Sequence, residues 1–252
     1  FRSLPPAGRD TLDKDIKKVE KTRGIKFEEK QRLAIVTAVQ KGLLILTGGP
    51  GTGKTTTING ILSLFEFDGL DVALTAPTGR AAKRMSEVTD RPAKTIHRLL
   101  EVEWDQNDKP VFNRNARNPL KENAVIVDEL SMVDISLFAA LMEALPIGCR
   151  LIMVGDADQL PPVGAGNVLH DLIASGLIPV VELKEIFRQA MESQIVLNAH
   201  KIVRGEMPQL DVRDKDFFFI DKPLPYQAAK LIGELCSERL PAAYGLSPIT
   251  DI

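Results

Sequence analysis

The segment at residues 48–55 (GGPGTGKT) has the residue types and spacing that can hold a chain of phosphates. It fits G-x-x-x-x-G-K-[ST] throughout, in which glycines let the backbone amides turn inward around an anion. A helix that begins at such a loop points its positive end at the phosphates. Lys54 would reach the β and γ phosphates, and the Thr55 hydroxyl would hold Mg²⁺. The pattern predicts ATP and Mg²⁺ as cofactors, with the nucleotide bound by Gly49, Pro50, Gly51, Thr52, Gly53, Lys54, Thr55 and Thr56.

Two carboxylates follow the apolar run AVIV, at Asp128 and Glu129. A buried strand ending there would place one carboxylate near a metal ion and the other near the γ-phosphate. We expect Asp128 to bind Mg²⁺ and Glu129 to polarise the attacking water. In isolation, such a pair is more often a helix cap with an acidic first turn. Downstream of a phosphate loop, the catalytic interpretation is favoured.

Apolar strands separated by helical patterns would position these groups. The strands expected at residues 43–47, 71–76, 124–127 and 151–154 are continuously apolar, which is typical of a parallel sheet covered on both faces. Helices are expected at about 54–65, from Gly79 onward, and around 95–100. The fold class is therefore α/β, a doubly wound P-loop nucleoside triphosphatase with ligands at the carboxyl ends of the strands.

Two stretches interrupt this alternation. Residues 101–122 are polar, contain Trp104, and predict a small hairpin insertion with Phe112 in one arm. After Leu183 the pattern begins again, with a helix near 193–204, a strand at 216–220 and a helix at 227–240. We expect a lead-in at 1–24, one large domain at 25–180 that carries the insertion, and the opening of a second unit at 181–252.

Composition excludes several classes of protein. A net charge of −2 argues against a generally basic nucleic-acid coat, although residues 80–98 and 109–121 are locally rich in Lys and Arg. Those clusters fit a phosphate backbone, or simply solvated surfaces. No apolar run approaches the roughly 20 residues that span a bilayer, and the start does not resemble a secretory signal. Two widely separated cysteines suggest a reducing compartment, so we expect a cytoplasmic protein without a membrane partner.

Further motifs give the chain a family resemblance. The string at 154–164 (VGDADQLPPVG) resembles motif III of superfamily 1 helicases, and specifically that of the RecD/TraA branch. Residues 75–82 (TAPTGRAA) resemble motif Ia, 95–100 the segment that follows it, and 183–189 (LKEIFRQ) motif IV. Gln31 stands where the Q motif would lie. The chain is thus similar to RecD-type DNA helicases from about residue 27 to 220. The motifs match those of the family, and they occur in the same order.

This resemblance implies roles around the nucleotide. Gln31 would read the adenine edge, Gln159 would sense the γ-phosphate and couple it to DNA, and Arg188 would act as an arginine finger. Without the family, Gln31 is one polar residue on an amphipathic helix and Arg188 a cation at a helix end. The resemblance also implies RecA-like folds, with 25–180 as domain 1A, 101–122 as a 1B-like insertion and 181–252 as an incomplete domain 2A.

For DNA, the turn after the second strand could offer hydroxyl and backbone N–H groups to a phosphate at a helix N-terminus. The residues expected to contact DNA are Pro77, Thr78, Gly79, Arg80, His97 and Arg98. A structural role for His97 is equally open. Trp104 and Phe112 could stack on bases, although packing within the hairpin is the favoured explanation for both.

The implied activity is ATP hydrolysis coupled to 5′→3′ movement on single-stranded DNA. The implied partners are single-stranded DNA, duplex ends and the subunits of a recombination complex. Motifs V and VI have no match, so we expect this stretch to hydrolyse ATP slowly without unwinding DNA. Two alternatives remain: a nucleotide-gated DNA-binding or regulatory subunit that does not translocate, and an AAA+-type ATPase that remodels proteins.

Overall fold

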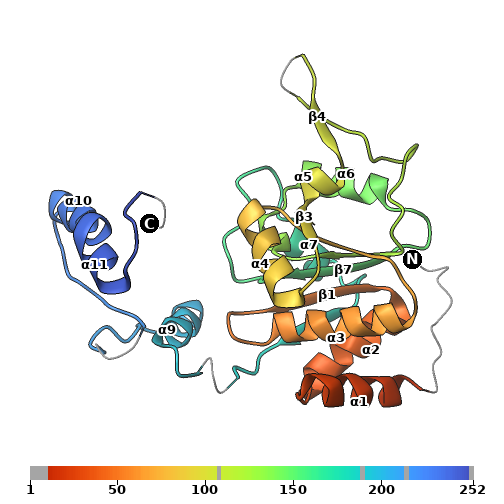
Figure 1. Cartoon of the computed structure of the whole chain (residues 1–252), viewed down its shortest axis with the longest axis horizontal. Helices are drawn as coiled ribbons and strands as arrows, with labels where there is room; N and C mark the ends of the chain where they lie inside the picture. Colours follow the sequence, from red (N-terminus) through yellow and green to blue (C-terminus); the bar gives the residue numbers. More distant parts are fainter. Residues whose placement is uncertain (1–10, 107–108, 188–190, 213–215, 250–252) are drawn as a thin grey trace.

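The computed structural model describes residues 11–106, 109–187, 191–212 and 216–249. Its main element is a six-stranded sheet in which every pairing is parallel, in the order β3-β2-β6-β7-β1-β8 (Figure 1). The strands are β1 (Leu43–Gly48), β2 (Val72–Ala76), β3 (Ala93–Thr95), β6 (Ala124–Val127), β7 (Arg150–Gly155) and β8 (Val180–Leu183). The α/β prediction is confirmed, and β3 and β8 are strands that the apolar runs did not reveal.

Helices cover both faces of this sheet because alternate strand residues are buried on opposite sides. One face packs against α1 (Leu12–Arg23), α2 (Glu29–Lys41), α3 (Lys54–Phe67) and α4 (Gly79–Thr89). The other packs against α5 (Ile96–Leu99), α6 (Ile135–Ala144) and α7 (Val168–Ala174), together with the 3-10 turn η1 (Leu130–Met132). In β1, for example, Leu44 and Leu46 face the first group and Ile45 the second.

The strand order brings three chemically important loops to one edge. β7 lies between β6 and β1, and β1 pairs with it from Leu43↔Leu151 to Thr47↔Gly155. Since all these strands run in the same direction, the loops after β1, β6 and β7 leave the same edge side by side. The phosphate loop, the Asp128-Glu129 pair and the motif III string occupy those loops.

The amino-terminal helix α1 contributes to the same core as the sheet. Its Ile16 and Val19 are buried in the cluster that includes α2 and α3. Arg32 of α2 links α2 to α1, donating to Glu20 at 3.2 Å and to Asp13 at 3.0 Å. The lower part of Figure 1 shows α1, α2 and α3 packed together.

The polar insertion forms the predicted hairpin, with β4 (Val102–Trp104) antiparallel to β5 (Pro110–Phe112). It stands away from the sheet in Figure 1. Phe112 is half-buried and its ring centroid lies 6.0 Å from that of His97. Trp104, in contrast, is 64% exposed, so the expectation that it packs within the hairpin is wrong.

After β8 the chain forms a separate lobe, drawn in blue in Figure 1. It contains α9 (Gln194–Val203), α10 (Pro225–Glu234), the π-helical turn η2 (Leu235–Arg239) and α11 (Leu240–Tyr244), which match the two helices predicted here. The strand expected at 216–220 is wrong. Asp216 instead caps α9, accepting from the backbone N–H of Gln194 at 2.7 Å and of Ile195 at 3.2 Å, and no strand among the described residues pairs with 217–220. The hydrogen bond from the Ser193 hydroxyl, and after it these two backbone N–H groups, lower the pKa of the Asp216 carboxyl.

Candidate active site

The phosphate loop joins β1 to α3 and is closed by its own hydrogen bonds. The Thr52 hydroxyl donates to the Gly49 carbonyl at 2.8 Å, and the Lys54 ammonium donates to the carbonyls of Gly48 (2.5 Å) and Gly49 (3.1 Å). Gly53, the N-cap of α3, has a φ of +84°, a backbone conformation that is unfavourable for a residue with a side chain. Lys54 is thus held inside the concave loop, where phosphate oxygens would replace the carbonyls that it now contacts.

Gln31 is buried beneath this loop. Its Oε1 accepts from the Glu28 N–H at 3.0 Å and completes a capping box at the start of α2. Its Nε2 donates to the Gly53 carbonyl at 3.2 Å. The side chain therefore joins α2 to the last glycine of the phosphate loop, and its amide also lines the cavity described below.

Asp128 and Glu129 come directly after β6. Burial raises the pKa of Asp128, although its hydrogen bond from the Glu129 N–H at 2.9 Å acts in the opposite direction. Burial also raises the pKa of Glu129, and the neighbouring Asp128 charge adds to that effect. Glu129 has φ +53°, a left-handed conformation uncommon for a residue with a side chain. This backbone turn directs the chain from β6 into η1.

The loop after β7 is tied to both of its neighbours. The Thr47 hydroxyl at the end of β1 accepts from the Ala157 N–H at 3.2 Å. The Ser131 hydroxyl, just after Glu129, donates to Oε1 of Gln159 at 3.2 Å. Asp156 is buried and accepts from the Asp158 N–H at 3.1 Å. Gln159 therefore has a direct link to the loop that carries Asp128 and Glu129.

A cavity of about 990 Å³ unites these groups. It is lined by the predicted residues Gln31, Gly49, Pro50, Gly51, Thr52, Gly53, Lys54, Thr55, Thr56, Asp128, Glu129 and Gln159. Arg188 lies outside the described residues, so its predicted role stays a prediction.

The predicted DNA contacts form a different group at the same edge of the sheet. β2 and β3 are neighbours, and the chain leaves them at Pro77 and Ile96. The Thr78 hydroxyl caps α4 by accepting from the Ala81 N–H at 3.2 Å. Gly79, Arg80 and Arg98 are exposed, whereas His97 is half-buried against Phe112. None of the six lines the cavity.

Several residues in the cavity were not predicted as site residues. Arg84 and Met85 come from α4, Asp156 and Asp158 from the motif III string, and Phe187 from the motif IV string. Arg84 belongs to the basic cluster at 80–98, but charge alone does not reveal which cation faces the nucleotide. His200 of α9 was also missed. Its Nε2 lies 3.0 Å from the Pro50 carbonyl, a contact across 150 positions that no local pattern indicates.

The donor set fits a magnesium ion. Thr55 and Asp128 carry side-chain oxygens, the type of ligand that Mg²⁺ prefers, and both line the cavity next to Lys54. Burial leaves the negative charge of Asp128 poorly solvated and raises its pKa, and a cation would compensate for this loss of solvation. The site could therefore hold a divalent ion together with a nucleoside triphosphate.

Known proteins share both the sequence and the fold. The family described as "AAA domain" matches residues 31–165. The ATP-dependent RecD2 DNA helicase of Deinococcus radiodurans is 41% identical over 206 residues, which is 82% of this chain and 28% of that protein. The RecBCD enzyme subunit RecD of Mycobacterium tuberculosis is 44% identical over 170 residues, covering 58% of this chain and 29% of the subunit.

The chain belongs to the AAA domain family. Within it, the sequence is of the RecD type, which confirms the resemblance seen in the motifs. Among solved structures, the Pif1 helicase of Candida albicans matches with a TM-score of 0.52 at 23% identity, covering 75% of this chain and 50% of that one, which supports the fold. This RecD-type chain spans less than a third of the length of these two curated relatives. None of its described helices is long and apolar enough to cross a membrane.

Proposed function

We propose that this chain is the ATP-hydrolysing part of a DNA helicase that couples Mg²⁺-dependent ATP hydrolysis to 5′→3′ movement on single-stranded DNA. One observation carries the proposal. Lys54, Asp128, Glu129 and Gln159 come from three separate loops and line one cavity. The RecD and RecD2 names of its relatives point to DNA as the track and to recombination and repair as the setting.

In this proposal each side chain has a physical task. Lys54 leaves the carbonyls of Gly48 and Gly49 and pairs with the β and γ phosphates. Glu129 orients the attacking water and accepts its proton, for which a raised carboxyl pKa is favourable. Thr55 and Asp128 hold Mg²⁺, which when bound neutralises charge on the phosphate oxygens. Arg188 acts as an arginine finger on the same phosphates.

The adenine end and the DNA side complete the assignment. Gln31 contacts the adenine while it supports Gly53. Single-stranded DNA runs over the edge formed by Pro77, Thr78, Gly79, Arg80, His97 and Arg98, with exposed Trp104 available to stack on a base. We assign 25–180 to a 1A domain with a 1B-like insertion at 101–122, and 181–252 to domain 2A. Subunits of a recombination complex are further proposed partners.

Steady-state ATP hydrolysis by the full-length protein tests this function. Lys54→Ala should lower kcat at least about a hundredfold, the loss typical when a preorganised charge-stabilising donor is removed. Lys41→Ala is the matched control, since Lys41 is an exposed lysine at the end of α2 that does not line the cavity. Equal hydrolysis by Lys54→Ala and wild type would contradict the assignment. ATP-dependent DNA binding without directional movement would favour the non-translocating alternative.

A further inference from the structure

Helix α4 connects the two sites of the proposed motor. It begins at Gly79, beside the turn assigned to DNA, and its N-cap is Thr78. Farther along, Ala81, Arg84, Met85 and Val88 all line the nucleotide cavity. These positions follow the i, i+3, i+4, i+7 spacing of a single helical face. One face of α4 is thus a wall of the nucleotide cavity.

Arg84 is the cation on that wall. Its charge acts on both Asp128 and Glu129 in the direction that lowers their pKa values, as the charge of Lys54 does. No ion pair between described residues includes Arg84. The side chain is exposed at the cavity, within electrostatic reach of the carboxylates but without a salt bridge to either. Triphosphate oxygens bound in this cavity would give it an anionic partner.

We propose that Arg84 contacts the phosphates of ATP and makes hydrolysis depend on DNA bound at the start of α4. This inference rests on the proposed function. Arg84 lies five positions after Gly79, about 7.5 Å along the helix axis. Buried Ala82 and Met85 hold the inner face of α4 in the core, so a phosphate bound at its N-terminus would act on a rigid helix that also carries Arg84. Because the helix is one rigid element, a displacement at its DNA-bound end would also displace Arg84 relative to the triphosphate.

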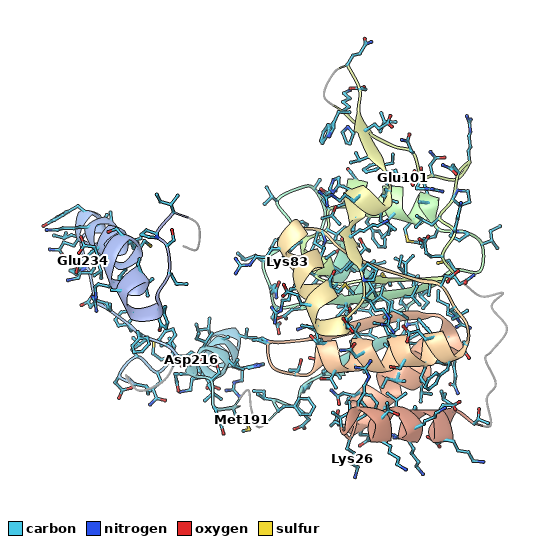
Figure 2. All side chains as sticks on the ribbon, in the orientation of Figure 1. Lys26, Lys83, Glu101, Met191, Asp216 and Glu234 are labelled. Atoms are coloured by element: carbon cyan, nitrogen blue, oxygen red, sulfur yellow. The ribbon has the colours of Figure 1, made fainter. Side chains whose placement is uncertain are left out.

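The neighbouring Lys83 provides a matched control. It carries the same charge on the same helix and is exposed, but it does not line the cavity (Lys83 is labelled in Figure 2). Since the Arg84 side chain is exposed, its replacement should leave the fold intact, which a thermal melt would verify. Arg84→Lys keeps the charge but loses the planar fork of the guanidinium, so it separates the need for charge from the need for geometry.

The experiment uses the full-length protein and measures kcat and KM for ATP with and without oligodeoxythymidylate. For Arg84→Ala we expect kcat to fall under both conditions, by about threefold without DNA and at least about thirtyfold with DNA, so that the stimulation by DNA drops about tenfold. Arg84→Lys should recover part of the stimulation, and Lys83→Ala should behave as wild type. Binding of the same oligonucleotide without nucleotide, measured by fluorescence anisotropy, should be unchanged in Arg84→Ala.

Three results would overturn the inference alone: wild-type stimulation in Arg84→Ala, loss of oligonucleotide binding, or an equal fall in the DNA-free and DNA-stimulated rates. The first would remove Arg84 from the coupling, the second would make it a DNA contact, and the third would make it a nucleotide contact unrelated to DNA. Failure of the wild-type protein to respond to DNA would instead overturn the proposed function and the inference with it.

Discussion

The Ser131 hydroxyl donates a hydrogen bond of 3.2 Å to Oε1 of Gln159. Ser131 lies in η1, two positions after Glu129, whereas Gln159 lies in the loop after β7. The bond therefore joins the loop that carries the proposed catalytic carboxylates to the loop proposed to sense the γ-phosphate. Both loops leave neighbouring parallel strands at the same edge of the sheet.

Removing this bond should weaken the coupling. In Ser131→Ala, Gln159 loses one hydrogen-bond partner. A lost hydrogen bond corresponds to about 1 kcal/mol, which is roughly a fivefold change in rate. We expect the DNA-stimulated kcat to fall by that factor while KM for ATP stays unchanged. Ser175→Ala is the control, because its hydroxyl bonds only locally, to the Leu172 carbonyl and the Leu177 N–H. An unchanged stimulated rate in Ser131→Ala would show that the bond does not support Gln159.

A methyl group at Gly53 should weaken nucleotide binding. It would press against the Gln31 amide and lie 2.6 Å from Cε2 of Phe187, at a position whose φ is +84°. Gly69→Ala is a close control, since Gly69 also has a positive φ (+66°) but no atom lies within 4 Å of an added Cβ. Titration with a fluorescent ATP analogue should show at least a tenfold weaker Kd for Gly53→Ala only. Equal affinities in the two variants would contradict the packing described here.

Asp128→Asn should stabilise the nucleotide-free protein and inactivate it. Burial raises the folded pKa of Asp128, so its neutral form favours folding below the ordinary carboxyl pKa of about 4, and that contribution is lost as pH rises through the raised value. Asparagine is neutral throughout, so its Tm should exceed that of wild type at pH 7, and the difference should shrink on acidification. Loss of a metal ligand should slow hydrolysis by about a hundredfold or more. A lower Tm for the variant at pH 7 would contradict the sign of this effect.

Ile16 tests whether α1 belongs to the folding unit of the sheet. This side chain is fully buried in the core shared with α2 and α3, so Ile16→Ala should cost about 2–5 kcal/mol of unfolding free energy. Ile202→Ala is the control, since Ile202 is 60% exposed on α9. Chemical denaturation measures both. A midpoint for Ile16→Ala that matches the control would mean that α1 unfolds independently of the sheet.

Much of the fold was predictable because the apolar runs and helical patterns that follow one another along the chain all indicated the same α/β fold. The apolar run at 124–127 is β6, and the helix expected from Lys54 is α3. The prediction of a strand at 216–220 is wrong for a physical reason. Apolar, β-favouring residues form a strand only where another strand is available to pair with them. Asp216 instead caps α9 by accepting a hydrogen bond from the Gln194 N–H.

The site was predictable where function requires a contiguous motif. Lys54 and Thr55 follow from the phosphate loop, and Asp128 from the end of a buried strand. Arg84 and His200 could not be found in this way. The first faces the cavity because of the rotation of a helix, and the second approaches Pro50 from an element 150 positions away. Both depend on packing, which local spacing does not encode.

The central claim, that this ATP site is coupled to DNA, is tested most directly by one comparison in the full-length protein. The measurement is the ratio of kcat for ATP hydrolysis with and without saturating oligodeoxythymidylate, in wild type and in Gln159→Ala. The account predicts a ratio of about ten or more in wild type, falling close to one in Gln159→Ala. A wild-type ratio of one, or an undiminished ratio in Gln159→Ala, would contradict it.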